Sequence, residues 1–318
     1  MKRKESQVRG NHLFQKLRKE WRFVAIALAA ATISFILGML MPGNQQGSGN
    51  PATAAMQVQN LNQSLTVNPL VKKVGDNQTA FNLDRTIEEL LTVLESKEKL
   101  LTFVPPEQFQ GTTVFEGKVK DSEKVIALTV DDGPWPETTE QMLDIFKQND
   151  VKATFFWLGQ SIENSPDIAR RVVAEGHAIG NHTWHHWYDP MDAATAANEI
   201  DRTAKLIYET TGVKTTFFRP PGGVLNNGLA KYAKEQNYAV VMWSVTSADT
   251  DPRAQPSAFV NNVLKGAKPG AIVLMHDGGG DRYRTIKALP EMIAGLKKQG
   301  YRFVTVPELL EMQGESAA

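Results

Sequence analysis

Short apolar runs alternate with amphipathic segments along the chain from residue 124 onward. The apolar runs are typical of buried strands and cover residues 124–130, 152–159, 177–182, 214–221, 238–245, 271–277 and 301–306. The amphipathic segments have helical spacing and cover residues 137–150, 165–176, 193–212, 226–237, 256–267 and 283–299. Strands that alternate with helices in this way predict a parallel α/β sheet, either open or closed as a barrel.

Ionisable side chains stand at the carboxyl ends of most of these predicted strands. They are Asp131 and Asp132 after the first strand, His182 after the third, Arg219 after the fourth, Asp249 after the fifth and His276 after the sixth. In a β/α barrel these strand ends share one face, and active sites are found on that face. The pattern therefore predicts a polar functional site there rather than scattered surface charges.

The first part of the chain has a different pattern. Residues 1–22 are basic, and residues 23–41 form an apolar run without a charge. A helix rises about 1.5 Å per residue, so this run is long enough to span a hydrocarbon core of about 30 Å. The basic flank is expected to stay in the cytoplasm, which predicts a single-pass bacterial membrane protein with its bulk outside the cell membrane. A cleaved signal peptide is the alternative interpretation.

Three segments separate this anchor from the end of the chain. Residues 42–82 are rich in small and polar residues and predict a flexible linker. Residues 83–120 are predicted to be a short helical and connecting region, because Leu83 to Leu101 have helical spacing and Pro105 ends it. We expect the globular domain to cover residues 121–312, followed by a tail at 313–318.

Composition excludes several kinds of site. The 318 residues include no cysteine, so disulfides, thiolate nucleophiles and cysteine zinc sites are all ruled out. The formal net charge is zero, and nothing in it indicates a nucleic-acid partner. The oligomeric state is left open.

Histidines crowd one short stretch of a chain that has only six of them. His182 and His186 are four residues apart, so on a helical turn both rings would face one side and grip one ion. The paired carboxylates of Asp131 and Asp132 would repel each other unless a cation neutralises one of them. Two histidines and one aspartate leave an open position on zinc, which is the catalytic pattern. The alternative for the aspartates is a loop that caps the next helix.

Five segments of the sequence occur in a familiar order: TVDDGPW, HTWHH, FFRPPGG, WSVTSADTD and IVLMHDGGG. They resemble the motifs of the polysaccharide deacetylases, carbohydrate esterase family four, and the resemblance covers about residues 124–310. It implies a distorted (β/α)7 barrel, a divalent metal and removal of N-acetyl groups from polymers of amino sugars. Zinc is the metal that the resemblance implies first, with cobalt or nickel as alternatives.

The same resemblance implies a role for each matching residue. Asp132, His182 and His186 would hold the metal, Asp131 would be the general base and His276 the general acid. Arg219 would hold Asp131, and Asp249 would pair with His276. Pro221, Gly222 and Leu274 are expected to contact substrate. Trp184 is interpreted either as a ring that stacks on a sugar or as a residue that packs in a lid. His185 is interpreted as a residue behind the ligands or on the surface.

The match departs from the family pattern in three motifs. Val130 stands where an aromatic residue is common, and Gly222 stands where a tyrosine is common. In the fourth motif Thr246 replaces an acidic residue and Thr250 replaces a tryptophan. These departures bear on the assignment of Asp249 and on the shape of the groove.

The sequence as a whole predicts a membrane-anchored, metal-dependent de-N-acetylase that acts on a cell-wall glycan, with peptidoglycan as the expected substrate. A catalytically weak envelope protein that binds glycan or has a structural role is one alternative, and a small-molecule amidohydrolase is another. The residues do not separate N-acetylglucosamine from N-acetylmuramic acid, or peptidoglycan from chitin oligomers or an exopolysaccharide.

Overall fold

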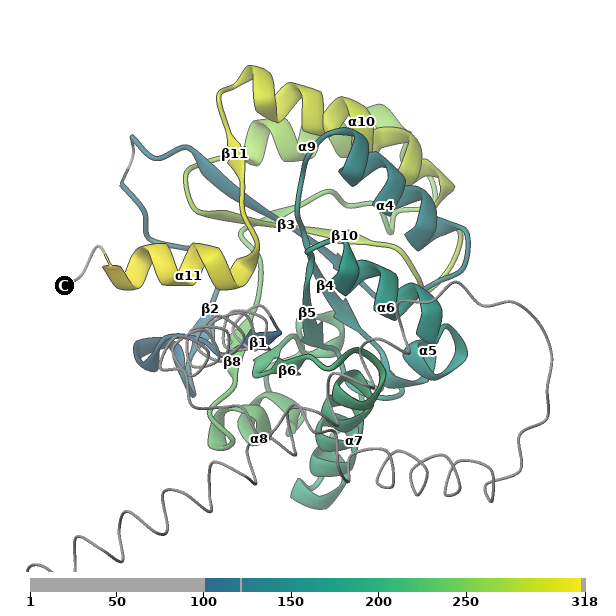
Figure 1. Ribbon diagram of the computed structural model, residues 1–318, viewed down its shortest axis with the longest axis vertical. Coiled ribbons are helices and arrows are strands. Elements are labelled where there is room, and N and C mark those ends of the chain that lie inside the picture. The colour runs from purple at the N-terminus through teal and green to yellow at the C-terminus, as the bar shows by residue number, and fades with distance from the viewer. Residues whose placement is uncertain (1–100, 121, 316–318) are drawn as a thin grey trace, which may run out of the picture. The chain divides into compact units, whose positions relative to one another are not determined.

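The computed structural model describes residues 101–120 and 122–315 (Figure 1). The predicted anchor at 23–41, the linker at 42–82 and the predicted helix from Leu83 up to residue 100 lie outside these residues. Every helix in the described part of the chain is too short or too polar to cross a lipid bilayer. Leu101, placed by its spacing at the end of a helix, lies in a turn just before the first described strand.

A curled sheet forms the centre of the described domain (Figure 1). Its strands are β2 (Thr113–Val114), β3 (Val125–Asp131), β4 (Thr154–Trp157), β5 (Ala178–Asn181), β7 (Phe217–Phe218), β8 (Ala239–Val241), β9 (Val245–Thr246), β10 (Ala271–His276) and β11 (Arg302–Phe303). Their order is β2-β8-β7-β5-β4-β3-β10-β9, with β11 paired to β3, and every ladder between them is parallel. A separate parallel pair joins β1 (Thr102–Phe103) to β6 (Lys214–Thr215).

Helices cover the outside of this sheet. They are α4 (Thr138–Gln148), α5 (Gly159–Asn164), α6 (Pro166–Ala174), α7 (Ala193–Thr211), α8 (Leu229–Glu235), α9 (Pro256–Gly266), α10 (Tyr283–Lys298) and α11 (Val306–Glu315), with short 3-10 turns η2 (Glu107–Phe109) and η3 (Pro221–Gly223). Helix α10 packs against α9 and α4, whereas α7 packs against α5, α6 and α8 (Figure 1). The predicted parallel α/β arrangement is therefore confirmed.

The strand predicted at 238–245 is wrong as a single element. It is broken into β8, which is next to the end strand β2, and β9, which is the strand at the opposite end of the order. At the break, the carbonyl oxygens of Val241 and Met242 accept hydrogen bonds of 3.0 Å from the buried side chain of Arg219. The N–H of Ser244 donates to the carbonyl of Ile272 on β10 (3.1 Å). One continuous segment thus pairs with β2 at one side of the sheet and with β10 at the other, which brings the two sides toward each other.

The domain begins earlier than the predicted boundary at residue 121. Strand β2 pairs with β8 at the edge of the sheet, and Phe109 and Val114 are buried in the core. They belong to a cluster that includes Val306 and Leu309 of α11. A strand of two residues is too short to show a period, so the sequence indicated only a connecting region here. Helix α11 likewise replaces the end of the last predicted strand and the start of the predicted tail.

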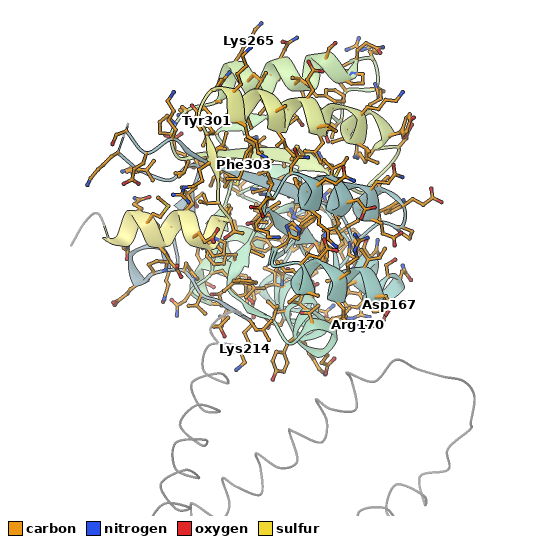
Figure 2. All side chains as sticks on the ribbon, turned by 45° about the horizontal axis from the view of Figure 1, so that its top comes forward. Asp167, Arg170, Lys214, Lys265, Tyr301 and Phe303 are labelled. Atoms are coloured by element: carbon orange, nitrogen blue, oxygen red, sulfur yellow. The ribbon has the colours of Figure 1, made fainter. Side chains whose placement is uncertain are left out.

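Side chains sort by burial as the sequence pattern indicates. All residues of β3, β4 and β5 are buried, and β10 is buried except at His276. Charged side chains such as Asp167, Arg170, Lys214 and Lys265 lie on the exposed outer surface (Figure 2). Burial of the apolar strands is the main term that stabilises this arrangement.

His177 is a core residue, as its position at the start of a strand indicated. Its Nδ1 accepts the N–H of Ala153 (3.1 Å), and its ring packs against Phe146 and Phe155. Burial lowers the pKa of His177 to about 3, so the ring is neutral near pH 7. It takes no part in the site described below.

Candidate active site

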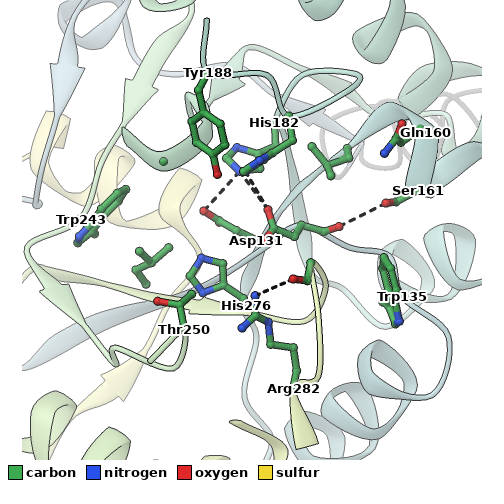
Figure 3. Close-up of a pocket in the computed structure, with 16 residues that line it drawn as sticks. Asp131, Trp135, Gln160, Ser161, His182, Tyr188, Trp243, Thr250, His276 and Arg282 are labelled. Carbon is green, nitrogen blue, oxygen red and sulfur yellow. Dashed lines mark hydrogen bonds and ion pairs between the residues drawn. The ribbon is translucent and has the colours of Figure 1, made fainter. Parts of the chain in front are cut away.

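A pocket of about 590 Å³ opens at the carboxyl ends of the central strands (Figure 3). Asp131 ends β3, His182 follows β5, Gly222 follows β7, and His276 ends β10. In the register of the sheet, His276 is the direct partner of Asp131. The pocket is lined by Asp131, Asp132, Trp135, Leu158, Gln160, Ser161, His182, His186, Tyr188, Gly222, Trp243, Thr250, Leu274, His276, Gly279 and Arg282.

Asp132, His182 and His186 converge at the floor of this pocket. The Oδ1 atom of Asp132 lies 3.4 Å from Nε2 of His182 and 3.2 Å from Nε2 of His186. One candidate ligand atom from each residue lies within 4.8 Å of the other two. The two imidazole rings are 5.0 Å apart between centroids. The structure therefore brings together all three residues that the sequence proposed as metal ligands.

The loop that carries the two histidines is not the helical turn that their spacing indicated. Strand β5 ends at Asn181, and Thr183 and His186 both have positive φ values, +74° and +63°. The side chain of Asn181 accepts the N–H of Thr183 (2.9 Å), and Thr183 Oγ1 accepts the N–H of His186 (3.1 Å). The rings converge because this loop folds back on itself, at a conformational cost for two residues that have a Cβ.

The ring of His182 is held with one nitrogen facing the cluster. Its Nδ1 lies 2.6 Å from the carbonyl oxygen of Arg219, which can only accept, so Nδ1 carries the proton. That leaves the lone pair of Nε2 directed at Asp132. Such a bond from the far nitrogen fixes the tautomer of a metal-binding histidine.

This donor set fits a divalent cation. Among the described residues, Oδ1 of Asp132 is buried and has no hydrogen-bond partner. A buried carboxylate oxygen without a partner is costly unless a cation satisfies it. Two imidazole nitrogens and a carboxylate oxygen are ligands that zinc takes in three-ligand catalytic sites.

Asp131 and Arg219 form a buried ion pair beside the cluster. Nη1 of Arg219 lies 2.7 Å from Oδ1 of Asp131 and 2.7 Å from Oγ1 of Thr129. The guanidinium also stacks over the ring of Phe156, 4.2 Å from its centroid. Oδ2 of Asp131 is left 3.9 Å from Nε2 of His182. The ion pair fixes one oxygen of the Asp131 carboxylate, and the other oxygen faces the three candidate metal ligands.

His276 and Asp249 form a second pair across the pocket (Figure 3 shows the His276 ring). Nδ1 of His276 lies 2.8 Å from Oδ1 of Asp249, and Oδ2 accepts the backbone N–H of His276 (2.9 Å) and the hydroxyl of Thr285 (3.0 Å). Burial acts to lower the pKa of His276, but the hydrogen bond and the charge of Asp249 outweigh it and raise the pKa. The substitutions at Thr246 and Thr250 thus leave this contact in place.

The four candidate residues for substrate contact fall into two groups. Gly222 and Leu274 line the pocket, and Pro221 is buried beside Gly222 in η3. Trp184 does not line it: its side chain is 4% exposed and lies against Gly159, with the guanidinium of Arg202 3.3 Å from the ring centroid. Of the two interpretations of Trp184, the structure favours packing over contact with the sugar.

Aromatic residues that the sequence reading left without a role line the pocket. Trp135 and Trp243 stand on opposite sides of it, and Tyr188 lies above the histidines (Figure 3). A Cβ atom on Gly222 would lie 2.7 Å from a ring carbon of Tyr188, so Tyr188 fills the space beside this glycine. Trp135 belongs to the TVDDGPW segment, and Tyr188 follows HTWHH by two positions. This closeness to the motifs is the only sequence feature that could have pointed to Trp135 and Tyr188 as pocket residues.

Asp277 is a further buried acid behind the site. The hydroxyl of Thr139 donates to its Oδ2 (2.5 Å), and its Oδ1 has no hydrogen-bond partner in the described part of the chain. Burial raises the pKa of Asp277 to about 7, while the hydrogen bond from Thr139 opposes that shift. A Cβ on Gly133 would lie 2.2 Å from Oδ2, so this acid packs directly under the loop that carries Asp132.

Comparison with known sequences gives one family and close relatives. Residues 118–241 match the family described as polysaccharide deacetylase. A peptidoglycan-N-acetylglucosamine deacetylase of Bacillus cereus is 43% identical over 207 residues, which covers 64% of this chain and 96% of the relative.

Two solved structures resemble the described domain. The crystal structure of a peptidoglycan N-acetylglucosamine deacetylase is 37% identical, with a TM-score of 0.59, covering 64% of this chain and 94% of the other. A CE4 family pseudoenzyme from Bacillus anthracis is 30% identical, with a TM-score of 0.57, covering 63% of this chain and 69% of the other. Similarity of this kind extends to both an enzyme and a protein described as a pseudoenzyme, so the site residues themselves have to decide on activity.

Proposed function

Because this chain belongs to the polysaccharide deacetylase family and is a deacetylase hydrolase, we propose that it removes N-acetyl groups from bacterial peptidoglycan in a metal-dependent reaction. The names of its relatives support the substrate. The single observation that carries the chemistry is the placement of two carboxylate-based pairs, Arg219–Asp131 and Asp249–His276, around the Asp132–His182–His186 cluster in one pocket.

Asp132, His182 and His186 would hold the cation. A divalent metal at such a site polarises a carbonyl oxygen and lowers the pKa of a coordinated water. Nδ1 of His182 donates to the carbonyl of Arg219, so the arrangement of its ring depends on the same residue that holds Asp131. Geometry at the ligands and at the base is therefore coupled.

Asp131 is placed to take the proton of the attacking water. Its Oδ1 is fixed by Arg219, and its Oδ2 faces the cluster, 3.9 Å from Nε2 of His182. A general base has to lie within hydrogen-bond reach of the proton that it removes. Because Asp131 is 2% exposed, bulk solvent does not compete for this carboxylate.

His276 is placed to protonate the leaving amine. Nδ1 is occupied by Asp249, which leaves Nε2 as the nitrogen that can transfer a proton in the pocket. The raised pKa keeps the ring protonated to higher pH than an isolated histidine. An amine leaves poorly as an anion, so this proton contributes only as the C–N bond breaks.

The backbone N–H of Gly222 is a candidate donor to the developing oxyanion. Gly222 lines the pocket with a φ of +57°. Oriented backbone donors stabilise the negative oxygen of an acyl-transfer transition state. Because Gly222 has no side chain, the ring of Tyr188 can occupy the space beside it.

The substrate is tested by comparing acetate release from several acetylated compounds. Full-length protein loaded with Zn²⁺ is incubated with peptidoglycan, chitin oligomers, O-acetylated xylan and a small N-acetyl amide. We expect the highest kcat/KM with peptidoglycan, and analysis of the products locates the new amine on glucosamine or muramic acid. Turnover of the small amide at equal or greater efficiency would support the amidohydrolase alternative, and no turnover of any compound would support a binding role.

We also propose that the catalytic domain works outside the cell membrane, held by the predicted anchor at 23–41 and the linker at 42–82. The basic flank before the apolar run and the polymeric substrate support this placement. Protease added to wall-stripped cells should cut in the linker and release a folded domain that still binds Zn²⁺. Release only after the cells are lysed would place the domain in the cytoplasm instead.

A further inference from the structure

Glu199 is a buried carboxylate that the reaction described above does not use. It lies near the middle of α7, and its side chain is 0% exposed. A buried carboxylate is costly unless donors satisfy its oxygens. Among the described residues, the donors to its carboxylate all come from a single loop, which is the one that carries the two histidine ligands.

Three hydrogen bonds join Glu199 to this loop. Oε2 accepts the backbone N–H groups of Trp184 (3.1 Å) and His185 (2.9 Å). Oε1 lies 2.6 Å from Nδ1 of the His185 side chain, and this nitrogen carries the proton because a carboxylate can only accept. Trp184 and His185 are the residues immediately before the ligand His186.

The side chains of the loop separate into two directions. The rings of His182 and His186 point toward Asp132, whereas Trp184 and His185 face α7. Arg202, three positions after Glu199 on the same helix, covers the ring of Trp184 at 3.3 Å. The ring of His185 stacks on Trp187 at 4.2 Å, with 5° between the planes. Helix α7 thus contacts the outer side of the loop over its central residues.

The loop needs such an anchor because its conformation is unfavourable by itself. Thr183 and His186 have positive φ values, and residues with a Cβ adopt this region only when surrounding contacts hold them there. Inside the loop, the N–H of Thr183 donates to the side chain of Asn181, and the N–H of His186 donates to the hydroxyl of Thr183. The N–H groups of Gly159 and Gln160 donate to the carbonyls of Thr183 and Trp184. Glu199 adds three hydrogen bonds from α7 to the two residues before His186.

We propose that Glu199 is a positioning residue for the metal site, acting through the backbone of residues 184 and 185 to hold His186 against Asp132. This inference rests on the proposed metal site. The function of Glu199 is to keep the ligands preorganised, so that binding the ion does not require the loop to be ordered first. Its loss should weaken metal binding in a protein that remains folded.

The experiment measures the dissociation constant for Zn²⁺ by competition with a chromogenic chelator, using metal-stripped full-length protein. The variants are Glu199→Ala, Glu199→Gln and His185→Ala. Asp201→Asn is the matched control, because Asp201 lies on the same helix and its carboxylate accepts the hydroxyl of Tyr232 (2.6 Å), away from the loop. Circular dichroism and thermal unfolding of the metal-free proteins report the fold separately.

We expect Glu199→Ala to weaken Zn²⁺ binding by about 10- to 100-fold, the usual cost of losing a partner behind the ligands. Glu199→Gln keeps an oxygen that can accept the backbone N–H groups, so it should recover part of the affinity. His185→Ala removes one of the three contacts and should have a smaller effect than Glu199→Ala. Asp201→Asn should bind as tightly as the wild type.

A dissociation constant within about twofold of wild type for folded Glu199→Ala overturns the proposal. So does a variant whose thermal unfolding shifts while its Zn²⁺ affinity does not, because that is the result of a purely structural role. If Glu199→Ala does not fold, unchanged affinity in both Glu199→Gln and His185→Ala is the overturning result. Wild-type protein that binds no Zn²⁺ also overturns it, whereas wild type that binds Zn²⁺ but releases no acetate overturns only the proposed function.

Discussion

Replacing His182 with alanine is expected to remove metal binding and acetate release together. His182 supplies one of three candidate ligand atoms, and its Nδ1 also holds the carbonyl of Arg219, which positions Asp131. Loss of a residue that only hydrogen-bonds to a ligand usually weakens metal binding by about 10- to 100-fold. Loss of His182 should weaken Zn²⁺ binding by more than this. Asp132→Asn should have a similar effect, because a neutral amide replaces the buried carboxylate oxygen that has no partner.

Metal content of dialysed protein and acetate release from peptidoglycan measure this prediction. Asp201→Asn serves as the control for an aspartate-to-asparagine change, since Asp201 lies outside the pocket. Full metal occupancy in both His182→Ala and Asp132→Asn would show that these residues are not the ligands.

Replacing Asp131 with asparagine is expected to lower kcat by about 10²- to 10⁴-fold while Zn²⁺ stays bound. The amide keeps the shape of the side chain and an oxygen that can face Arg219, but it cannot take a proton from water. Asp131 is not one of the three converging ligands, so metal affinity should change little. An Asp131→Asn protein that keeps kcat within about threefold of wild type would assign the base to another residue.

The pH dependence of kcat reports the proton donor on the other side of the pocket. His276 acts in its protonated form, so the rate should fall as pH rises through its pKa, which Asp249 raises despite burial. Asp249→Asn removes that charge, so the alkaline limb should move to lower pH while metal binding is retained. An alkaline limb that does not move in Asp249→Asn would mean that another group controls it.

The site could be predicted from sequence as far as it depends on strand ends. Asp131, Asp132 and His276 follow continuous apolar runs, and parallel pairing of β3 with β10 brings those ends together without further information. The convergence of His182 and His186 was also expected, but for the wrong local reason. Their loop depends on positive φ values and on contacts from α7, and the i, i+4 spacing reveals neither.

Features set by distant contacts could not be predicted in this way. At the break between β8 and β9, the fully buried side chain of Arg219 donates hydrogen bonds to two backbone carbonyls. These carbonyls lie more than twenty positions away in the sequence. The flat ring of Trp184 is of the kind that stacks on sugars, yet it is packed between Arg202 and Gly159. Glu199 had no motif at all, because a single glutamate on an amphipathic helix gives no sign that it turns inward.

Deacetylation of peptidoglycan by this pocket is tested most directly by measuring both products of the reaction. Zn²⁺-loaded full-length protein is incubated with purified, fully N-acetylated peptidoglycan, and released acetate and new glycan amines are quantified by mass spectrometry. We expect equal amounts of acetate and amine from the wild type and a loss of about 10²- to 10⁴-fold with Asp131→Asn. Acetate without a matching amine, or no acetate from wild-type protein that holds its metal, would contradict the assignment.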